Sequence, residues 1–272
     1  MNSRQHNLTG VALITGSASG IGRAVAHAFV NEGCTRVILA DIDKKGLAVV
    51  AKELEELNPS VHTCSVVCDT SSETDVQRMV DEGVNQFGAI HYAVNNAGVS
   101  NKPRAPIHEL ELSAFDRVQN INLRGVWLCE RAEIRQMLKQ DTDLTIRSGP
   151  AQRGSIINIS SIFAKTAHFS ASAYCASKAG VIGLSRSDAC AYGNDGIRVN
   201  SVSPGWIRTP LVDFGIRNGT YDEDIVSRIP MERWGSPDDI ADAVLFLAGP
   251  RSSFITGQDI IVDGGSVIKS VS

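Results

Sequence analysis

The sequence has no excess of positive charge and no basic run. It contains 26 lysine and arginine residues against 30 aspartate and glutamate residues, which gives a formal net charge of −4. Binding to nucleic acid depends on basic side chains that displace counterions from the phosphate backbone. We therefore expect no nucleic-acid partner.

Long apolar runs are also absent. No window contains the roughly 18 uncharged apolar residues that a membrane-spanning helix requires. The first ten residues, MNSRQHNLTG, are polar and lack the apolar stretch of a secretory signal. We expect neither a membrane span nor a secretory leader.

Metal-binding patterns of cysteine are missing. The six cysteines form no Cys-x-x-Cys pair and have no histidine pattern beside them, so the sequence predicts no metal site. Their dispersal in apolar segments is typical of reduced, buried thiols, and we expect a cytoplasmic protein.

What the sequence does contain is a regular alternation of strand and helix patterns. Short apolar runs predict strands at 11–15, 36–41, 61–67, 90–95, 155–160, 197–203 and 258–265. Helices are predicted between them, among them 44–57, one to about residue 87 that starts at a Thr70-x-x-Glu73 capping box, one from Ser113 to about Leu138, one from about Ser172, and one capped by Ser236. Continuous apolar strands separated by helices indicate an α/β fold: a Rossmann-type doubly wound parallel sheet of about seven strands, with helices on both faces.

No repeat or linker divides the chain, so we interpret residues 1–272 as one domain with a core at 8–265. Residues 139–153 are polar and are interpreted as a surface excursion without chemistry. Residues 204–234 form a connection long enough to be a functional loop, and we expect it to act as a lid over the substrate.

A glycine-rich turn follows the first predicted strand. Its spacing, Gly16-x-x-x-Gly20-x-Gly22, between a strand and a helix suits the approach of a pyrophosphate to a helix N-terminus, although a tight turn alone would also explain it. Asp41 ends the second strand, where a carboxylate accepts hydrogen bonds from both ribose hydroxyls and repels a 2′-phosphate. The sequence therefore favours NAD(H) over NADP(H), and Lys44 and Lys45 weaken this preference slightly.

Tyr174 and Lys178 are four residues apart in a predicted helix, so they share a face. An ammonium close to a phenol favours the phenolate and brings its pKa toward neutrality. Ser161, thirteen residues upstream of Tyr174, is placed to bring a hydroxyl to the same reacting oxygen. A tyrosine–lysine pair alone is weak, because two polar residues on a helix are common.

Taken together, these motifs resemble those of the short-chain dehydrogenase/reductase family. The matching segments run in order from Leu8 to about Gly265: the glycine turn, Asp69, Asn95-Asn96-Ala97-Gly98, Asn122, Ser161, Tyr174-x-x-x-Lys178, Pro204-Gly205 and Thr209.

The resemblance implies a catalytic set of four residues. Tyr174 would be the general acid/base, Ser161 would orient the substrate oxygen, and Lys178 would lower the pKa of Tyr174 and hold the nicotinamide ribose. Asn122 would complete a proton relay. Ser160 is an alternative to Ser161, which the spacing to Tyr174 favours.

The resemblance also implies the residues that bind NAD(H), with NADP(H) less favoured. Asp69 would contact the adenine, Asn95 would fix the fourth strand near the adenosine, and Ile207 and Thr209 would hold the carboxamide. The whole set is Gly16, Ser19, Gly20, Ile21, Gly22, Asp41, Ile42, Asp69, Asn95, Ala97, Gly98, Tyr174, Lys178, Pro204, Gly205, Ile207 and Thr209.

We expect a small-molecule substrate that is apolar and fairly bulky, bound by Ser161, Phe163, His168 and Trp206, although such side chains also pack lids and interfaces. The predicted reaction interconverts a secondary alcohol and a ketone. Two alternatives stay open: other chemistry on the same fold, such as dehydration, epimerisation or cyclisation, and a cofactor-binding scaffold without turnover. The resemblance further implies a homo-oligomer, either dimer or tetramer, that pairs through the helices near 113–138 and 172–191.

Overall fold

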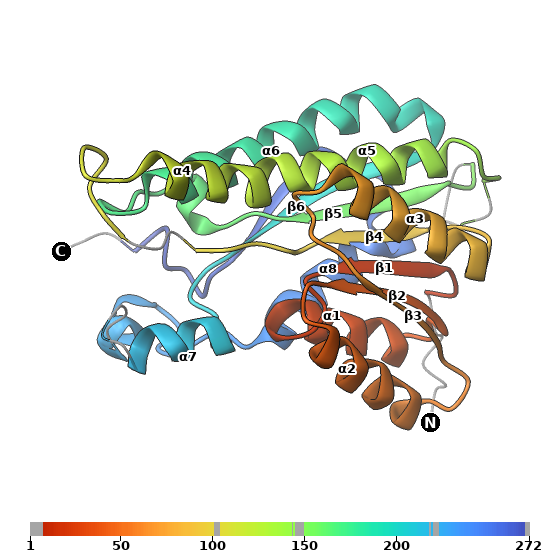
Figure 1. Cartoon of the computed structure of the whole chain (residues 1–272), viewed down its shortest axis with the longest axis horizontal. Coiled ribbons are helices and arrows are strands. Elements are labelled where there is room, and N and C mark those ends of the chain that lie inside the picture. The colour runs from red at the N-terminus through yellow and green to blue at the C-terminus, as the bar shows by residue number, and fades with distance from the viewer. Residues whose placement is uncertain are drawn as a thin grey trace.

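The computed structural model describes residues 8–100, 104–142, 144, 150–217, 219 and 223–269. Within them, seven parallel strands form one sheet in the order β3-β2-β1-β4-β5-β6-β7 (Figure 1). The strands are β1 (Val11–Thr15), β2 (Arg36–Asp41), β3 (His62–Val67), β4 (Tyr92–Asn95), β5 (Gly154–Ile159), β6 (Ile197–Pro204) and β7 (Asp259–Val262). The predicted Rossmann-type doubly wound parallel sheet is confirmed.

Helices cover both faces of this sheet (Figure 1). One face carries α1 (Gly20–Asn31), α2 (Lys44–Leu57) and α8 (Pro237–Ala248). The other carries α3 (Glu73–Phe87), α4 (Leu112–Gln119), α5 (Gly125–Met137) and α6 (Ser172–Tyr192). The remaining helix, α7 (Pro210–Arg217), lies outside both layers, within the segment predicted as a lid.

Strand β1 shows why the apolar runs are continuous. Alternate side chains of a strand point to opposite faces, so a strand covered on both sides needs an apolar residue at every position. Ala12 and Ile14 belong to the core under α1, α2 and α8, while Val11 and Leu13 belong to the core under α3, α5 and α6. All four are fully buried.

The order of the strands creates the place for a site. The chain moves from β1 outward to β2 and β3, then returns to place β4 on the other side of β1. The connections therefore diverge at the carboxyl ends of β1 and β4, and ligands of such sheets bind in the crevice that this divergence leaves.

Two predicted helix starts are wrong. Ser72, not Thr70, caps α3, because its hydroxyl accepts from the backbone N–H of Asp75. The expected partner Glu73 turns away to Arg131, 2.6 Å distant. Ser113 lies inside α4, which begins one residue after Glu111.

The predicted helix from Ser113 to Leu138 is not one continuous α-helix. A π-helical turn, Asn120–Arg124, separates α4 from α5. π-Turns of this kind are frequent at functional sites, because they rotate one side chain out of the α-helical register.

The last strand is shorter than predicted. β7 ends at Val262 because Gly264 and Gly265 have positive φ values of 61° and 89°, which turn the chain out of the sheet. The cap at Ser236 is confirmed as a full capping box with Asp239.

The excursion at 139–153 lies partly outside the described residues. Its base is held by Gln140, whose amide nitrogen donates to the carbonyl oxygens of Ile90 and Arg153, at 2.6 and 3.1 Å. Leu144 and Gln152 pair in a short antiparallel bridge.

All six cysteines are described and free of disulfides. The expectation that all are buried is wrong for Cys190, which is exposed, and for Cys175, which is half-buried. Among the described residues, no helix is both long and apolar enough to cross a bilayer.

Candidate active site

A cleft of about 620 Å³ opens at the carboxyl ends of β1, β2, β4, β5 and β6. Most of the residues predicted for the site line it. Those of the predicted set that line the cleft are Gly16, Ser19, Gly20, Ile21, Asp41, Ile42, Asp69, Ala97, Gly98, Ser161, Phe163, Tyr174, Lys178, Pro204, Gly205, Trp206, Ile207 and Thr209. Gly22, Asn95, Asn122 and His168 lie beside the cleft rather than in its wall.

The glycine turn between β1 and α1 leaves no room for side chains. Gly16 and Gly20 have positive φ values of 66° and 54°. A Cβ at Gly16 would lie 2.8 Å from Asn96 Nδ2, and one at Gly22 would lie 2.2 Å from the Gly16 carbonyl oxygen. Gly22 therefore serves the packing of the turn, and the bare backbone lets an anionic group approach the N-terminus of α1.

Asn96 holds this turn in place. Its Nδ2 donates to the carbonyl oxygens of Thr15 and Gly16, each at 3.0 Å, and its backbone N–H donates to the Thr15 hydroxyl at 3.0 Å. Asn96 was not among the predicted site residues, although it lies in the Asn95–Gly98 motif. Asn96 couples the end of β4 to the end of β1.

Asp41 lies beside the glycine turn with both carboxylate oxygens fixed. Oδ2 accepts from the backbone N–H of Ala18 and Oδ1 from that of Asp43, each at 3.0 Å. A carboxylate held at this wall of the cleft offers acceptors to hydroxyl groups and repels a phosphate.

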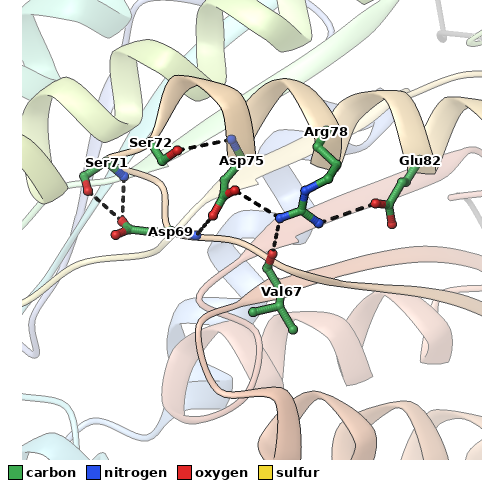
Figure 2. A network of polar contacts seen from close by, with 7 residues as sticks. All are labelled: Val67, Asp69, Ser71, Ser72, Asp75, Arg78 and Glu82. Atoms are coloured by element: carbon green, nitrogen blue, oxygen red, sulfur yellow. Dashed lines mark hydrogen bonds and ion pairs between the residues drawn. The ribbon is translucent and has the colours of Figure 1, made fainter.

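Asp69 is held in the turn between β3 and α3 (Figure 2). Its Oδ1 accepts from the N–H of Ser71 at 2.9 Å and from the Ser71 hydroxyl at 2.7 Å. Its own N–H donates to Asp75 Oδ2 at 3.1 Å and is the main reason that the pKa of Asp75 is lowered. Arg78 donates to Asp75 and to the carbonyl oxygen of Val67, so the turn is tied to both neighbouring elements.

Asn95 points into the protein interior. Its Nδ2 donates to Glu133 Oε2 and to Asn158 Oδ1, both at 3.0 Å. Asn158 in turn donates to Glu130 Oε1 at 2.7 Å and to the Ser185 hydroxyl at 2.9 Å. These five residues form a buried polar cluster that joins β4, β5, α5 and α6, so the side chain of Asn95 supports the cleft from behind.

Two buried carboxyl groups dominate this cluster. Burial raises the pKa of Glu130 to about 8 and that of Glu133 to about 7. Glu130 Oε2, Glu133 Oε1 and Asn95 Oδ1 have no hydrogen-bond partner among the described residues. A protonated carboxyl group supplies a donor in such a cluster, which agrees with the raised pKa values.

Helix α6 presents Tyr174 and Lys178 on one face, as the spacing predicts. Lys178 Nζ lies 5.8 Å from the centre of the Tyr174 ring and donates to the carbonyl oxygen of Ile159 at 2.7 Å. Desolvation lowers the pKa of Lys178 to about 8, so the ammonium is still largely charged at neutral pH. A positive charge in this position favours the ionised form of the phenol.

The two neighbouring serines differ in their hydrogen bonds. Ser161 Oγ accepts from the N–H of Phe163 at 3.2 Å, a bond that uses an acceptor lone pair and not the hydroxyl proton. Ser160 Oγ donates to the carbonyl oxygen of Lys178 at 2.8 Å. The proton of Ser160 is therefore engaged with α6, whereas the proton of Ser161 is not used by this contact.

Asn122 lies in the π-helical turn between α4 and α5. Its Oδ1 accepts from the N–H of Val99 at 2.8 Å, and its Nδ2 donates to the carbonyl oxygen of Val99 at 2.9 Å. A Cβ at Gly98 would lie 3.3 Å from Asn122 Oδ1 and 3.5 Å from Lys178 Nζ. Asn122 and Lys178 thus border the same glycine, although Asn122 is fully buried.

The segment after β6 closes another side of the cleft. Gly205 lies so close to Asp263 that a Cβ there would be 2.6 Å from the Asp263 Cβ. Ile207 pairs with Gly235 in a short parallel bridge, which ties the start of the 204–234 segment to its end. Both Ile207 and Thr209 line the cleft.

Aromatic rings surround Phe163 at the substrate end. Its ring centre lies 6.4 Å from that of Tyr174, 5.6 Å from that of His168 and 5.7 Å from that of Trp206, all with edge-to-face geometry. Trp206 meets Trp234 in the same way at 6.3 Å. These rings give the cleft a broad apolar wall next to Tyr174.

Arg104, Arg117 and Ile121 were not predicted as site residues, yet all three line the cleft. Arg117 and Ile121 are four residues apart, so helical spacing could have predicted that they lie on one face, next to Asn122. Arg104 lies in an irregular loop, where no periodicity indicates the direction of a side chain.

Comparison with known proteins identifies the family. The model of the family described as Enoyl-(Acyl carrier protein) reductase matches residues 16–267. The chain is 38% identical over 274 residues to the short-chain dehydrogenase fogB of Aspergillus ruber, with 98% of this chain and 100% of that protein covered. It belongs to the short-chain dehydrogenase/reductase family.

Two further relatives are informative. A cis-4-hydroxycyclohexanecarboxylate dehydrogenase of Sinomonas cyclohexanicum is 37% identical over 255 residues, which cover 94% of this chain and 95% of that protein. The crystal structure of levodione reductase superposes with a TM-score of 0.87 at 32% identity and covers 96% of this chain and 98% of that one. Members of this family are oxidoreductases that use a nicotinamide coenzyme, and the glycine turn, Asp41 and Asp69 suit such a ligand.

Proposed function

We propose that this short-chain dehydrogenase/reductase is an NAD(H)-dependent oxidoreductase that interconverts a secondary alcohol and a ketone on a bulky, apolar, cyclic substrate. The observation that carries the proposal is the single cleft of about 620 Å³ in which Tyr174, Lys178 and Ser161 meet the glycine turn and Asp41. Nothing in the packing of the sheet requires these polar groups there.

The residues at the carboxyl edge of the sheet suit NAD(H) in an extended conformation. The bare glycine turn would accept the pyrophosphate, Asp41 the adenosine ribose hydroxyls, and Asp69 the adenine amino group. Lys178 would hold the nicotinamide ribose, and Ile207 and Thr209 the carboxamide. When bound, the coenzyme supplies or accepts the hydride.

The proton is moved by the chain's own residues. Tyr174 gives its phenolic proton to the carbonyl oxygen during reduction, and removes the hydroxyl proton during oxidation. The Lys178 ammonium stabilises the phenolate form of Tyr174. The Ser161 hydroxyl donates a hydrogen bond to the substrate oxygen that exchanges the proton with Tyr174. Asn122 lies next to Lys178, and a proton relay would continue from it to solvent.

The substrate end supports the apolar, cyclic part of the proposal. Phe163 and Trp206 present ring edges and faces next to Tyr174, so a flat or ring-shaped apolar body fills this space better than a small charged acid. The relative from Sinomonas cyclohexanicum acts, by its name, on a cyclohexane ring that carries a hydroxyl group and a carboxylate, so it supports the cyclic part of the proposal and not the apolar part.

Oligomer formation is part of the proposal. A second cavity of about 560 Å³ runs between the outer faces of α4 to α6 and is lined mainly by Leu123, Trp127, Gly180, Gly183 and Leu184. We propose that two copies pair across this groove, as a dimer or within a tetramer. We also propose a reducing, cytoplasmic location, because all six cysteines are free thiols.

The test of the reaction is the loss of NADH absorbance with 4-methylcyclohexanone as substrate. Tyr174→Phe removes only the phenolic oxygen, so we expect turnover to fall by about a thousandfold. NADH binding, followed by fluorescence, should stay close to that of the wild type. A variant that keeps near wild-type turnover would show that Tyr174 is not the acid/base, and turnover without net change in NADH would favour the non-redox alternative.

A further inference from the structure

Lys165 and Asp259 form an ion pair between the turn after β5 and the strand β7, with 3.0 Å between Nζ and Oδ2. The Asp259 side chain is 1% exposed and that of Lys165 is 33% exposed, so the carboxylate is buried while the ammonium keeps some contact with solvent. The Ser201 hydroxyl donates to Asp259 Oδ1 at 2.7 Å, and the Ser203 hydroxyl lies 2.8 Å from Oδ1 and 3.0 Å from Oδ2. One buried carboxylate thus binds one charged donor and two neutral donors.

The alternation of side chains along the strands explains why these groups meet. Ser201 and Ser203 are two residues apart on β6, and Asp259 is the residue of β7 that pairs with Ser201. The three side chains therefore point to the same face of the sheet. Val199 shares this face and belongs to the core under α3, α5 and α6. The carboxylate consequently points to the side of the sheet that carries α6, and Lys165 reaches it from that side.

Lys165 closes the short turn that begins at Ser161. The N–H of Ala164 donates to the carbonyl oxygen of Ser161, and the N–H of Lys165 donates to that of Ile162, each at 2.9 Å. The hydroxyl oxygen of Ser161 accepts from the N–H of Phe163 within the same turn. These hydrogen bonds determine the shape of the turn, but they do not determine its position relative to the sheet.

Polar contacts hold the turn to the sheet at both of its ends. At the start, the N–H of Ser160 donates to the carbonyl oxygen of Val202 at 2.8 Å, which continues the pairing of β5 with β6. At the end, Lys165 binds Asp259 on β7. Without the second contact the turn can pivot about the first, and this would move the Ser161 hydroxyl. A small misplacement of a group that must meet a reacting atom lowers the rate strongly.

We propose that Lys165 and Asp259 are positioning residues, which hold the Ser161 hydroxyl in place for the substrate oxygen without touching the substrate. Both lie outside the lining of the cleft. The inference rests on the function proposed above, in which Ser161 donates to the oxygen that exchanges a proton with Tyr174. It extends the set of residues on which this step depends from β5 and α6 to the edge strand β7.

Single variants test the role of the ammonium. Lys165→Met keeps an unbranched apolar chain and removes the charge, and we expect kcat for 4-methylcyclohexanone to fall about tenfold or more. NADH affinity should stay close to that of the wild type, because the pair does not line the cleft. Lys165→Arg keeps the charge and should retain most of the activity. Lys52→Met is the matched control: it removes an exposed lysine that pairs with Glu56 on α2, and should behave as the wild type.

A second substitution separates positioning from stability. Lys165→Met leaves the carboxylate of Asp259 buried without its cation, which should lower Tm. Adding Asp259→Asn removes that buried charge, so Tm should recover most of its loss. The turn still lacks its ion pair, so kcat should remain low. If kcat recovers together with Tm, or if Lys165→Met keeps the wild-type kcat, the pair only stabilises the fold and the inference fails.

A double-mutant cycle identifies the residue through which the pair acts. Ser161→Ala alone should lower kcat about a hundredfold, because a hydrogen bond to the reacting oxygen is lost. In that background Lys165→Met should lower kcat by less than about twofold, since the hydroxyl that it would misplace is absent. A further tenfold loss in the Ser161→Ala background would overturn the inference.

Hydrogen exchange tests the hold on the turn without turnover. The amides of residues 163–166 should exchange faster in Lys165→Met than in the wild type, and at the wild-type rate in Lys52→Met. If the wild type does not reduce the ketone but this exchange becomes faster, the pair holds the turn and the proposed reaction fails. Unchanged exchange at 163–166 would overturn the inference whatever the turnover.

Discussion

Asp41 has its two carboxylate oxygens held by backbone N–H groups, and this leaves little freedom for the side chain to move away from a ligand. A 2′-phosphate placed against it would bring two negative charges together at the same wall of the cleft. We expect Asp41→Ser to reduce affinity for NADH about tenfold and to raise the use of NADPH, since the serine keeps a short polar side chain near Ala18 without the charge. Kinetics with both coenzymes measure this change.

A second variant sharpens that prediction. Ile42 lines the cleft and is 73% exposed, so an arginine there meets solvent rather than core. Asp41→Ser combined with Ile42→Arg should complete the switch to NADPH. Unchanged coenzyme preference in both variants would mean that Asp41 is not at the ribose, and would remove the main support for NAD(H).

At the scale of whole elements, the pattern of the sequence specified some parts of the site and not others. β1, the glycine turn and α1 could be placed from residues 11–31 alone, because each position is constrained by local geometry. The same holds for Tyr174 and Lys178, whose contact needs only a helix. The segment around Asn122 could not be placed, since the π-helical turn depends on packing against Val99 and α6.

Other parts of the site could not be predicted because they depend on contacts between residues far apart in the sequence. Lys165 lies four residues after Ser161, and its Nζ lies 3.0 Å from Asp259 Oδ2. Asp259 also accepts from the hydroxyls of Ser201 and Ser203. β7 thereby holds the turn after β5, although the two are separated by nearly a hundred residues of chain. No local sequence pattern predicts such a contact.

The buried pair on α5 makes stability depend on pH. Glu130 and Glu133 have folded-state pKa values of about 8 and about 7, above the ordinary 4.5, so the folded protein binds more protons than the unfolded chain between pH 4.5 and about 8. The free energy of unfolding should fall as pH rises through this range. Asp188, Glu133 and the buried thiols nearby do not reverse the sign, because none brings a positive charge to the pair.

Replacing either carboxyl by an amide tests this directly. Glu130→Gln and Glu133→Gln stay neutral at every pH, so we expect each to raise Tm by about 3 °C or more at pH 8 relative to the wild type, and to change it little at pH 5. Thermal melts at several pH values give the comparison. The exposed Glu55→Gln is the control and should follow the wild type. A melt in which the glutamine variants lose stability equally at pH 5 and pH 8 would contradict a protonated pair.

For the molecule as a whole, the groove between α4, α5 and α6 is the surface that a second copy would cover. Trp127 is 43% exposed beside it, and a Cβ added at Gly183 meets nothing within 4 Å. An arginine at this position therefore fits the isolated chain, where it also improves helix propensity. In a two-fold pair it would face its own copy and add to the charge of Arg124, which lines the same groove.

We expect light scattering to give twice or four times 29.1 kDa for the wild type, and 29.1 kDa for Gly183→Arg at the same concentration. Gly183→Ala adds no charge and should remain assembled. The circular dichroism of Gly183→Arg should match the wild type, because the substitution displaces no neighbour in the monomer. A wild type that scatters as a monomer, or a Gly183→Arg variant that stays assembled, would show that this groove is not where the copies pair, and would leave Trp127 and Leu184 as solvent-facing residues of a chain that works alone.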